Sequence, residues 1–462
     1  MKGELIEHDH QPSYATQNGR MTRSTFEKAG FVLSLMVLAF LYGWAARWHG
    51  WFPDAVLEQA QREADKVLHN PSLTSRVYDR SGVQFERSDT TQSGLTLIAS
   101  YWPYEDGWGT GLRLLDKEGT VVHDWRVDRA TLFPDSTDRR GDPLDKNLHG
   151  TYLFPNGDVL VNVDYVGTAR LDACGDVRWQ LPLGTHHSIA RAGDGHFWIP
   201  GTSRQPRRTT DRYPEGFPGL DDPVWLDQLL HVSEEGRVLD TINVLDVLYA
   251  NDLEHHIVKA YQPQAATESP RTRDITHLND IEPLRPSMAD EYPLFDAGDL
   301  LVSLRNLDLV FVFDPDSGTT KWHVSSPFIR QHDPDFTGEG WIGVFDNRTD
   351  FMPRGQMLGG SRIVSFQPHT DSMRIRFPTS QSDPFYTDVL GKWQSLNNGH
   401  MLLTESKAGR VVEVAPDGST VWEWVMRPYS DSKVSRVPGA TRYDITRENV
   451  RTWPCSNLTT NN

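Results

Sequence analysis

Residues 152–163 read YLFPNGDVLVNV, and residues 169–179 read ARLDACGDVRW. In each stretch two short apolar runs flank a turn that contains glycine, which is the pattern of a β-hairpin. Two successive hairpins supply four antiparallel strands, the content of one blade of a β-propeller. This stretch therefore predicts an all-β protein built from blades.

The same two hairpins alternate along most of the chain. Hairpins of the first kind also occupy 189–201, 295–306, 336–347 and 394–406, and 96–111 is the candidate for a sixth. Hairpins of the second kind occupy 112–125, 169–179, 230–240, 310–322, 362–377 and 411–424. Because the order is as regular as the composition, we predict a six-bladed β-propeller over residues 94–430 in preference to a β-sandwich or two barrels. A polar C-terminal tail, 431–462, either wraps over this domain or stays disordered.

The N-terminal region has a different character. Residues 30–46 read GFVLSLMVLAFLYGWAA and carry no charge, close to the roughly 20 apolar residues that a membrane span needs. We therefore expect a single transmembrane helix over 30–52, with a cytoplasmic segment (1–29) before it and a helical stalk or linker (53–93) after it. This arrangement places the propeller on the periplasmic or extracellular side of the inner (cytoplasmic) membrane.

Charge and cysteine content limit the possible partners. The formal net charge of −17 argues against nucleic acid, because phosphate binding requires a basic face. Two cysteines, Cys174 and Cys455, are too few for a disulfide scaffold or a thiolate metal site. They can form one disulfide in an oxidising compartment, but the sequence does not establish that they meet.

Histidine recurs at one position of the repeat. His149, His187 and His332 each lie seven residues before the turn residue of a first-kind hairpin. Equivalent positions on the inner strands of a propeller converge on its axis, so these side chains are predicted to line a central channel. A fourth blade offers His277, and in a fifth Gly391 takes the position. His186, beside His187, is expected to face the other way.

Four segments together resemble a known family. They are HHSIARAGDGHFWIPG (186–201), HLNDIEPL (277–284), QHDPDFTGEGWIGVFDNR (331–348) and GKWQSLNNGHMLLTE (391–405). In this order they resemble the bacterial PAPS-independent arylsulfate sulfotransferases and the wider arylsulfotransferase-like family. The resemblance covers about residues 94–426. It implies a periplasmic propeller that passes a sulfuryl group from an aryl sulfate to a phenol through a channel histidine, with no cofactor or metal.

The resemblance also implies individual roles. His332 matches the histidine that accepts the sulfuryl group. His277, Asn279 and Arg305 match the groups that clamp it, and His187 matches a third channel histidine, which would transfer the proton. Four further residues are predicted to line the channel: His149, Asp280, Asp333 and Asn347. Arg285 and Arg348 are alternatives for the part given to Arg305.

Two other functions remain open from the residues alone. The axial histidines, with Asp280 and Asp333, would also suit a bound metal ion, because neutral imidazole is a common ligand. Alternatively, the protein is a non-catalytic, membrane-tethered scaffold whose insertions, 201–228 and 250–275, bind protein partners. The basic run 204–212 within the first insertion is expected to be a solvated loop.

Overall fold

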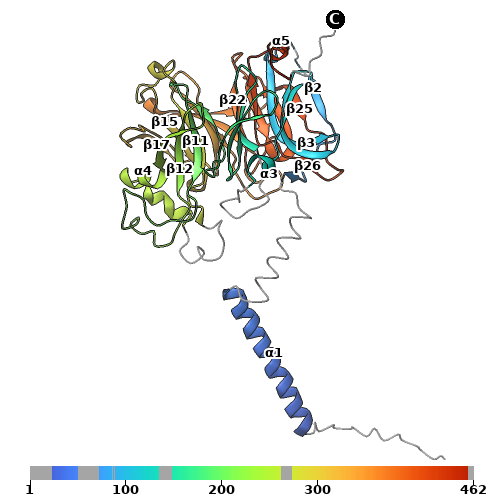
Figure 1. Ribbon diagram of the computed structural model, residues 1–462, viewed down its shortest axis with the longest axis vertical. Helices are drawn as coiled ribbons and strands as arrows, with labels where there is room; N and C mark the ends of the chain where they lie inside the picture. Colours follow the sequence, from blue (N-terminus) through green and yellow to red (C-terminus); the bar gives the residue numbers. More distant parts are fainter. Residues whose placement is uncertain are drawn as a thin grey trace, which may run out of the picture. The chain divides into compact units, whose positions relative to one another are not determined.

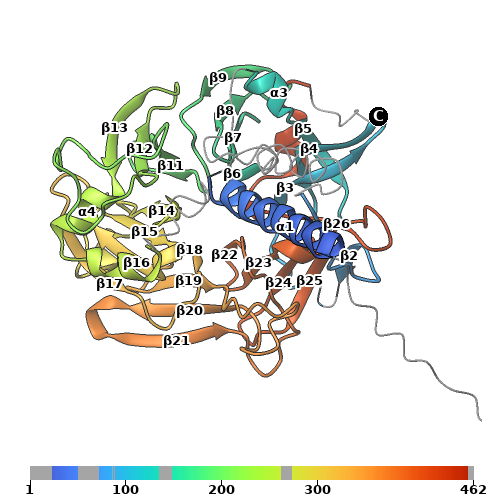
Figure 2. The same cartoon turned by 90° about the horizontal axis from the view of Figure 1, so that it is seen from below.

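The computed structural model describes residues 23–49, 72–85, 87, 89–134, 148–261 and 273–455 of the 462-residue chain. The chain divides into two units, Met1–Asn70 and Pro71–Asn462. The described part of the first unit is helix α1 (Arg23–His49). The second unit is an all-β propeller of six blades, as the sequence predicts, and Figures 1 and 2 show its sheets side by side and then arranged around the ring axis.

Each blade is an antiparallel sheet. Blade one consists of β27 (Ala440–Tyr443), β3 (Leu95–Tyr104), β4 (Gly107–Leu115) and β5 (Val121–Arg126). Blade two consists of β6 (Leu148–Leu153), β7 (Val159–Val163), β8 (Gly167–Leu171) and β9 (Val177–Leu181). Blade three consists of β10 (Ala190–Arg191), β11 (Phe197–Thr202), β12 (Asp227–Val232) and β13 (Val238–Asn243).

The remaining blades follow in chain order. Blade four consists of β14 (Leu278–Pro283), β15 (Leu300–Leu304), β16 (Leu309–Phe313) and β17 (Thr320–Val324). Blade five consists of β18 (His332–Phe336), β19 (Ile342–Asp346), β20 (Arg362–Gln367) and β21 (Ser372–Phe377). Blade six consists of β22 (Trp393–Ser395), β23 (Met401–Glu405), β24 (Arg410–Val414) and β25 (Thr420–Val425), with β2 (Gly82–Phe85) as a fifth strand.

The hydrophobic core lies between neighbouring blades. The second strands β15, β19 and β23 are buried along their whole length, because both of their faces pack against other blades. One position shows how close this packing is. A Cβ atom on Gly343 would lie 2.2 Å from the ring of Trp393, so only glycine lets blades five and six approach this far.

Both ends of the propeller unit close the ring. Strand β27, from the predicted tail, is the inner strand of blade one and pairs with β3, while β2 pairs with β25 in blade six. The hairpin at 96–111 therefore forms the second and third strands of its blade, and not the first two as predicted. The predicted boundaries, 94–430, omit both closing strands. A second short pairing joins β1 (Leu73–Thr74) to β26 (Val434–Ser435).

A disulfide adds to this closure. Cys174, in the turn between β8 and β9, is bonded to Cys455, which follows helix α5 (Arg447–Arg451), with an S–S distance of 2.02 Å. The two cysteines are 281 residues apart in sequence. This answers the question that the sequence left open.

The N-terminal predictions need correction. No helix in the described part of the chain is long and apolar enough to cross a membrane, so the predicted transmembrane helix over 30–52 is not supported. Helix α1 takes in charged residues at 23, 27 and 28 that the predicted span excluded, and residues 50–52 lie outside the described ranges. Residues 53–71 of the predicted stalk also lie outside them, and the rest of it contributes the extended strands β1 and β2.

The two insertions extend from blade three and from the connection between blades three and four. Residues 203–226, within the first, connect β11 to β12, and the second follows helix α4 (Val244–Ala250) with a short 3-10 helix, η1 (Glu254–Lys259). Residues 262–272 lie outside the described part. A last short helix, α3 (Arg129–Leu132), is capped by the side chain of Asp128.

Candidate functional site

Histidines from successive blades meet at the axis. His149 and His332 belong to the inner strands β6 and β18, and His187 and His277 come shortly before β10 and β14. All the inner strands start at the same face of the ring, so their first residues converge there. The ring centroids of His149 and His187 are 4.4 Å apart, and those of His187 and His277 are 5.0 Å apart. His332 lies close enough to lower the pKa of His187, and His149 and His277 in turn lower the pKa of His332.

The hydrogen bonds of His332 define its tautomer. Its Nδ1 lies 2.6 Å from Asn347 Oδ1 and 3.1 Å from the backbone oxygen of Arg330. The Asn347 amide is oriented by its own NH₂ group, which donates to the backbone oxygens of Thr387 and Leu390. Both atoms beside Nδ1 are therefore acceptors, so Nδ1 carries the proton.

The other nitrogen of His332 is consequently unprotonated. Nε2 is buried and has no hydrogen-bond partner among the described residues. Burial, and then the positive charge of Arg305, hold the pKa of His332 well below its ordinary value of 6.5. This imidazole is neutral at physiological pH, with a lone pair on Nε2 available for bonding to an electrophile.

Two carboxylates stand behind the other histidines. Asp274 Oδ2 lies 2.5 Å from His277 Nδ1. Asp164 Oδ2 lies 3.3 Å from His149 Nδ1, and its Oδ1 accepts the backbone N–H of His187 at 3.0 Å. A carboxylate behind an imidazole orients the ring and stabilises its protonated form, so both pairs suit proton transfer. The sequence reasoning missed both aspartates.

The sequence predicts that His186 faces away from the site. In the structure it is instead buried beneath the site. Its Nδ1 lies 2.8 Å from Nδ1 of His187, and one of the two nitrogens must donate to the other. His187 itself has a left-handed backbone conformation (φ 54°), so the regular alternation of side chains expected along a strand does not apply here. Burial and the nearby His149, His186 and His277 hold the pKa of His187 well below 6.5.

The predicted clamp residues lie around the same point. Asn279 donates through Nδ2 to the backbone oxygen of Gln331 at 2.7 Å, and its Oδ1 is buried without a hydrogen-bond partner among the described residues. Arg305 follows β15 and influences the pKa of His332. Arg285, an alternative to Arg305, is instead exposed and paired with Glu282 at 3.6 Å. Arg348 is held against Asp346 through its backbone N–H.

A small cavity continues into the channel from the histidines. Its volume is about 80 Å³, and His149, Asn279 and His332 line it at one end. Farther in, the lining is acidic. The acidic residues are Asp280, Glu282, Asp333 and Asp335. A cavity of this size holds a few water molecules or a small polar group, and not a whole aromatic ligand.

The negative charge at the acidic end of the cavity is reduced by an ion pair with Lys392 and by the raised pKa values of three carboxyl groups. Lys392 Nζ lies 2.9 Å from Asp333 Oδ1, and Asp333 Oδ2 accepts the backbone N–H of Trp393. Burial acts to lower the pKa of Lys392, but the surrounding carboxylates outweigh it and raise that pKa. Burial also raises the pKa of Asp280 and Asp335 well above the usual range, and raises the pKa of Glu282 to about 7. Asp280 and Asp333 thus form the acidic floor of the channel.

Gly391 takes the histidine position in blade six for a steric reason. Its φ is +105°, and a Cβ atom there would lie 2.7 Å from the ring of Phe345. The preceding residue, Leu390, supplies one of the carbonyls that orient Asn347. Blade six therefore supports His332 through Asn347 and contributes no imidazole at this position.

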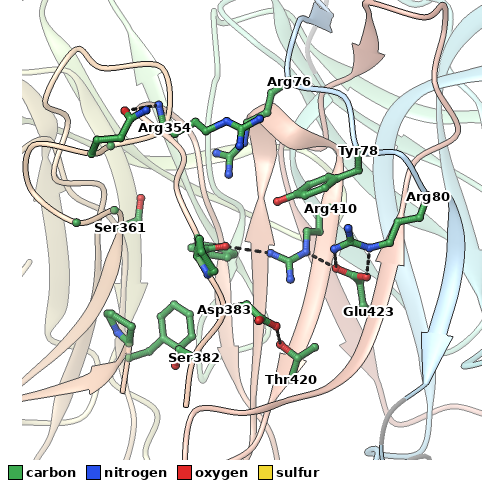
Figure 3. Close-up of a pocket in the computed structure, with 18 of the residues that line it drawn as sticks. Arg76, Tyr78, Arg80, Arg354, Ser361, Ser382, Asp383, Arg410, Thr420 and Glu423 are labelled. Atoms are coloured by element: carbon green, nitrogen blue, oxygen red, sulfur yellow. Dashed lines mark hydrogen bonds and ion pairs between the residues drawn. The ribbon is translucent and has the colours of Figure 1, made fainter. Parts of the chain in front are cut away.

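A larger pocket of about 1090 Å³ lies between blades five and six and the segment 76–84 (Figure 3). Three of its four arginines are bound to acidic neighbours: Arg76 pairs with Glu405, Arg80 makes two hydrogen bonds of 2.7 Å to Glu423, and Arg410 contacts both Glu423 and Glu405. These contacts hold the N-terminal strands to blade six. Because most of these cations are paired within the protein and no imidazole lines the pocket, we place the candidate site at the histidines.

The two regions are nevertheless in contact. Ser361, which lines the larger pocket, donates from Oγ to the backbone oxygen of Asn347 at 3.0 Å, on the far side of Asn347 from His332. The pocket wall therefore helps to hold the residue that fixes the tautomer of His332.

The fold and site together are those of a six-bladed propeller with an axial set of imidazoles, two of which are backed by carboxylates. The chain belongs to the arylsulfotransferase (ASST) family, which matches residues 150–427, more than half of its length. The family match supports a generally arylsulfotransferase-like function, with aryl sulfates and phenols as its class of substrates.

Other comparisons show distant likeness only. A protein of unknown function from Bacteroides caccae is 12% identical, with a TM-score of 0.46 over 75% of this chain and 98% of the other. Virginiamycin B lyase from Staphylococcus aureus is 9% identical, with a TM-score of 0.35 over 66% of this chain and 87% of the other. No curated protein matched the chain. Likenesses this distant do not bear on the function.

Proposed function

We propose that the protein transfers a sulfuryl group from an aryl sulfate to a phenol through a covalent intermediate on Nε2 of His332. One observation carries this proposal: Nε2 of a neutral, buried imidazole has no hydrogen-bond partner among the described residues, while Nδ1 holds the proton. An imidazole acts as a nucleophile only when it is neutral and one ring nitrogen has a free lone pair. The family match supports the same substrate class.

In the first step, Nε2 attacks the sulfur atom of the aryl sulfate. The N–S bond forms as the bond from sulfur to the aryl oxygen breaks, and the phenolate leaves with that electron pair. His277 donates the proton that the phenolate takes up. The contact of His277 with Asp274 supports this assignment, because the carboxylate stabilises a protonated imidazole. His187, to which the family resemblance gives the proton, has a pKa well below 6.5 and is poorly suited to donate one.

In the second step, the oxygen of an acceptor phenol attacks the same sulfur atom. The N–S bond breaks, its electron pair returns to Nε2, and His277 takes the phenol proton. Arg305 and the amide of Asn279 stabilise the charge on the sulfonate oxygens in both steps. The enzyme thus ends each cycle in its starting protonation state.

The size of the channel cavity limits how the substrate binds. At about 80 Å³ it accommodates the sulfuryl group but not the aromatic ring. We therefore propose that the aryl group stays outside, at the mouth formed by the loops that precede the inner strands. Such an arrangement tolerates different aryl groups on donor and acceptor.

We further propose that the propeller works in an oxidising compartment such as the periplasm. The disulfide between Cys174 and Cys455 supports this placement, because such bonds persist outside the reducing cytosol.

The test is the intact mass of the protein after brief exposure to 4-nitrophenyl sulfate. We expect the gain of one sulfuryl group, its loss when phenol is added, and no gain in His332→Ala. His369→Ala, which changes an exposed histidine in another turn, is the matched control and should label normally. If the folded protein gains no mass and releases no nitrophenol over a panel of aryl sulfates, the proposal is wrong for those donors.

A second candidate function is metal binding at the same site. Ligand atoms of His149, Asp164 and His187 all lie within 4.8 Å of one another, which suits a two-histidine, one-carboxylate metal site. The distinguishing measurement is adduct formation after treatment with a chelator. Metal chemistry predicts that labelling is lost on chelation and restored by metal, whereas the sulfohistidine route predicts no change.

A further inference from the structure

A second group of potential ligands lies in blade three, outside the channel. Asp194 and His196 are in the turn between β10 and β11, and His231 is in the neighbouring strand β12. This turn is at the opposite end of β10 from His187, so the group is separate from the axial histidines. We propose that Asp194, His196 and His231 bind a divalent transition-metal ion of the zinc class.

The distances between the three ligand atoms fit such an ion. Asp194 Oδ2 lies 3.2 Å from His196 Nδ1 and 3.2 Å from His231 Nε2. All three atoms lie within 4.8 Å of one another. In a tetrahedral zinc site with bonds of about 2.0–2.1 Å, neighbouring ligand atoms are about 3.4 Å apart. The two distances from Asp194 Oδ2 are close to this spacing, and the two nitrogens lie within 4.8 Å of each other, so small side-chain rotations bring the three atoms onto one ion.

Apart from their contacts with the Asp194 carboxylate, the two nitrogens have no polar partner among the described residues. His196 Nδ1 and His231 Nε2 are both removed from solvent, and neither has a hydrogen-bond partner among the described residues. Removing a polar nitrogen from water without a partner is unfavourable, and a metal ion between the two nitrogens and the carboxylate would satisfy both. This observation is independent of the distances and points to the same ligand.

The neighbouring structure holds the three side chains in place. Asp194 Oδ1 accepts the backbone N–H of His196 at 2.9 Å, which leaves Oδ2 to face the two imidazoles. The ring of His231 stacks on Trp198, its cross-strand partner, with centroids 4.6 Å apart and planes 10° apart. Second contacts of this kind orient ligands in known metal sites.

The chemistry of the donors selects the ion. Two imidazoles and one carboxylate favour Zn²⁺, Co²⁺, Ni²⁺ or Cu²⁺ over Mg²⁺ and Ca²⁺, which prefer oxygen ligands. The side chains of Asp194 and His196 are 47% and 36% exposed, so solvent can supply the fourth ligand. Because the ligands join the β10–β11 turn to β12, the bound ion would cross-link three strands of blade three.

The experiment uses full-length, tag-free protein that has been stripped with a chelator. Zn²⁺ is titrated by calorimetry, and Co²⁺ binding is followed by the visible absorption of its four-coordinate complexes. The wild type is compared with His231→Ala, His196→Ala and the surface control His369→Ala. His149→Ala is included because the axial group also offers three ligand atoms.

We expect one Zn²⁺ site that survives in His149→Ala and His369→Ala and weakens at least tenfold in His231→Ala and His196→Ala. Zn²⁺ should also raise the melting temperature of the wild type but not that of His231→Ala. Equal Zn²⁺ affinity in the wild type and His231→Ala, or no binding by the wild type, overturns the proposal. Labelling by aryl sulfate is measured in His231→Ala, His196→Ala and His369→Ala, which lie outside the channel. It should be unchanged in these three variants, so failure of the metal site and failure of the sulfuryl-transfer proposal are distinguishable.

Discussion

Asn347 Oδ1 accepts the Nδ1 proton of His332 across 2.6 Å, and two backbone carbonyls prevent the Asn347 amide from turning over. Together with the backbone oxygen of Arg330, which lies 3.1 Å from the same nitrogen, this contact determines which nitrogen of His332 is free. A residue that touches no substrate in our proposal thus controls the nucleophile.

Replacing Asn347 should therefore impair the first half-reaction without removing the nucleophile. In Asn347→Leu the acceptor is lost, the ring can turn or change tautomer, and we expect the rate of adduct formation to fall about 10- to 100-fold. Asn347→Asp keeps an acceptor and should retain more of the rate. Stopped-flow release of nitrophenol measures both variants, and equal rates in Asn347→Leu and the wild type would contradict the proposed role.

The low pKa of His332 predicts an unusual pH profile. A histidine with an ordinary pKa loses its nucleophile as the pH falls through about 6.5. Here the folded-state pKa lies well below that value, so the rate of adduct formation should stay level from about pH 8 to below about 6.5. With 4-nitrophenyl sulfate the leaving group needs no proton, so the profile reports the nucleophile. A fall in rate with its midpoint near 6.5 would show that His332 is not in the state described here.

The same reasoning gives a matched comparison. A carboxylate at position 347 favours protonated His332, so Asn347→Asp should raise the pKa of the nucleophile. As the pH is lowered, the rate of adduct formation by Asn347→Asp should then fall at a higher pH than the rate of the wild type does.

Removing Lys392 should destabilise the channel floor. In Lys392→Met, Asp333 keeps its bond to the backbone of Trp393 but loses its cation, while three other acidic side chains remain nearby. Because the Lys392 side chain is 36% exposed, water compensates in part, and we expect a loss of about 1–3 kcal/mol. Urea unfolding measures it. Lys407→Met removes a lysine of similar exposure, 38%, whose partner Asp388 is itself 30% exposed, and should change stability by less than about 1 kcal/mol.

The disulfide should contribute measurably to stability. Breaking the bond in Cys455→Ser releases the C-terminal segment from blade two, and we expect a loss of about 2–4 kcal/mol. Thermal unfolding with and without reductant measures this loss. The wild type in reductant should match Cys455→Ser, and the variant itself should not respond to reductant. If reductant leaves the melting temperature of the wild type unchanged, the bond does not contribute.

Much of the fold was predictable because the repeat is local. Five blades consist of hairpins whose strands are adjacent in sequence, and their turn residues mark each one. Blade one was assigned incorrectly because its inner strand, β27, is four residues long and pairs with a strand more than 330 residues away. No local pattern carries that information. The transmembrane prediction rested on the length of the uncharged run 30–46 and is not supported by the described helix.

The candidate site was predictable where it follows the repeat. Counting seven residues back from each turn located three axial histidines. Counting eight residues forward from the turns of blades two, four and five reaches the residues that follow the second strands, Asp164, Arg305 and Asn347. The prediction used the last two only by resemblance, so applying the count to every blade would have found Asp164. Asp274 lies beyond an insertion that breaks the register, and no spacing rule identifies it.

Closure by both ends has a consequence for biosynthesis. Blade one lacks its inner strand until residue 443 has left the ribosome, and blade six meets β2, one of the earliest strands to emerge. During most of translation β3 therefore presents an open sheet edge, a feature that promotes association with other chains. The ring can be completed only after residue 443 has been synthesised, which favours late folding and gives chaperones a long period in which to bind.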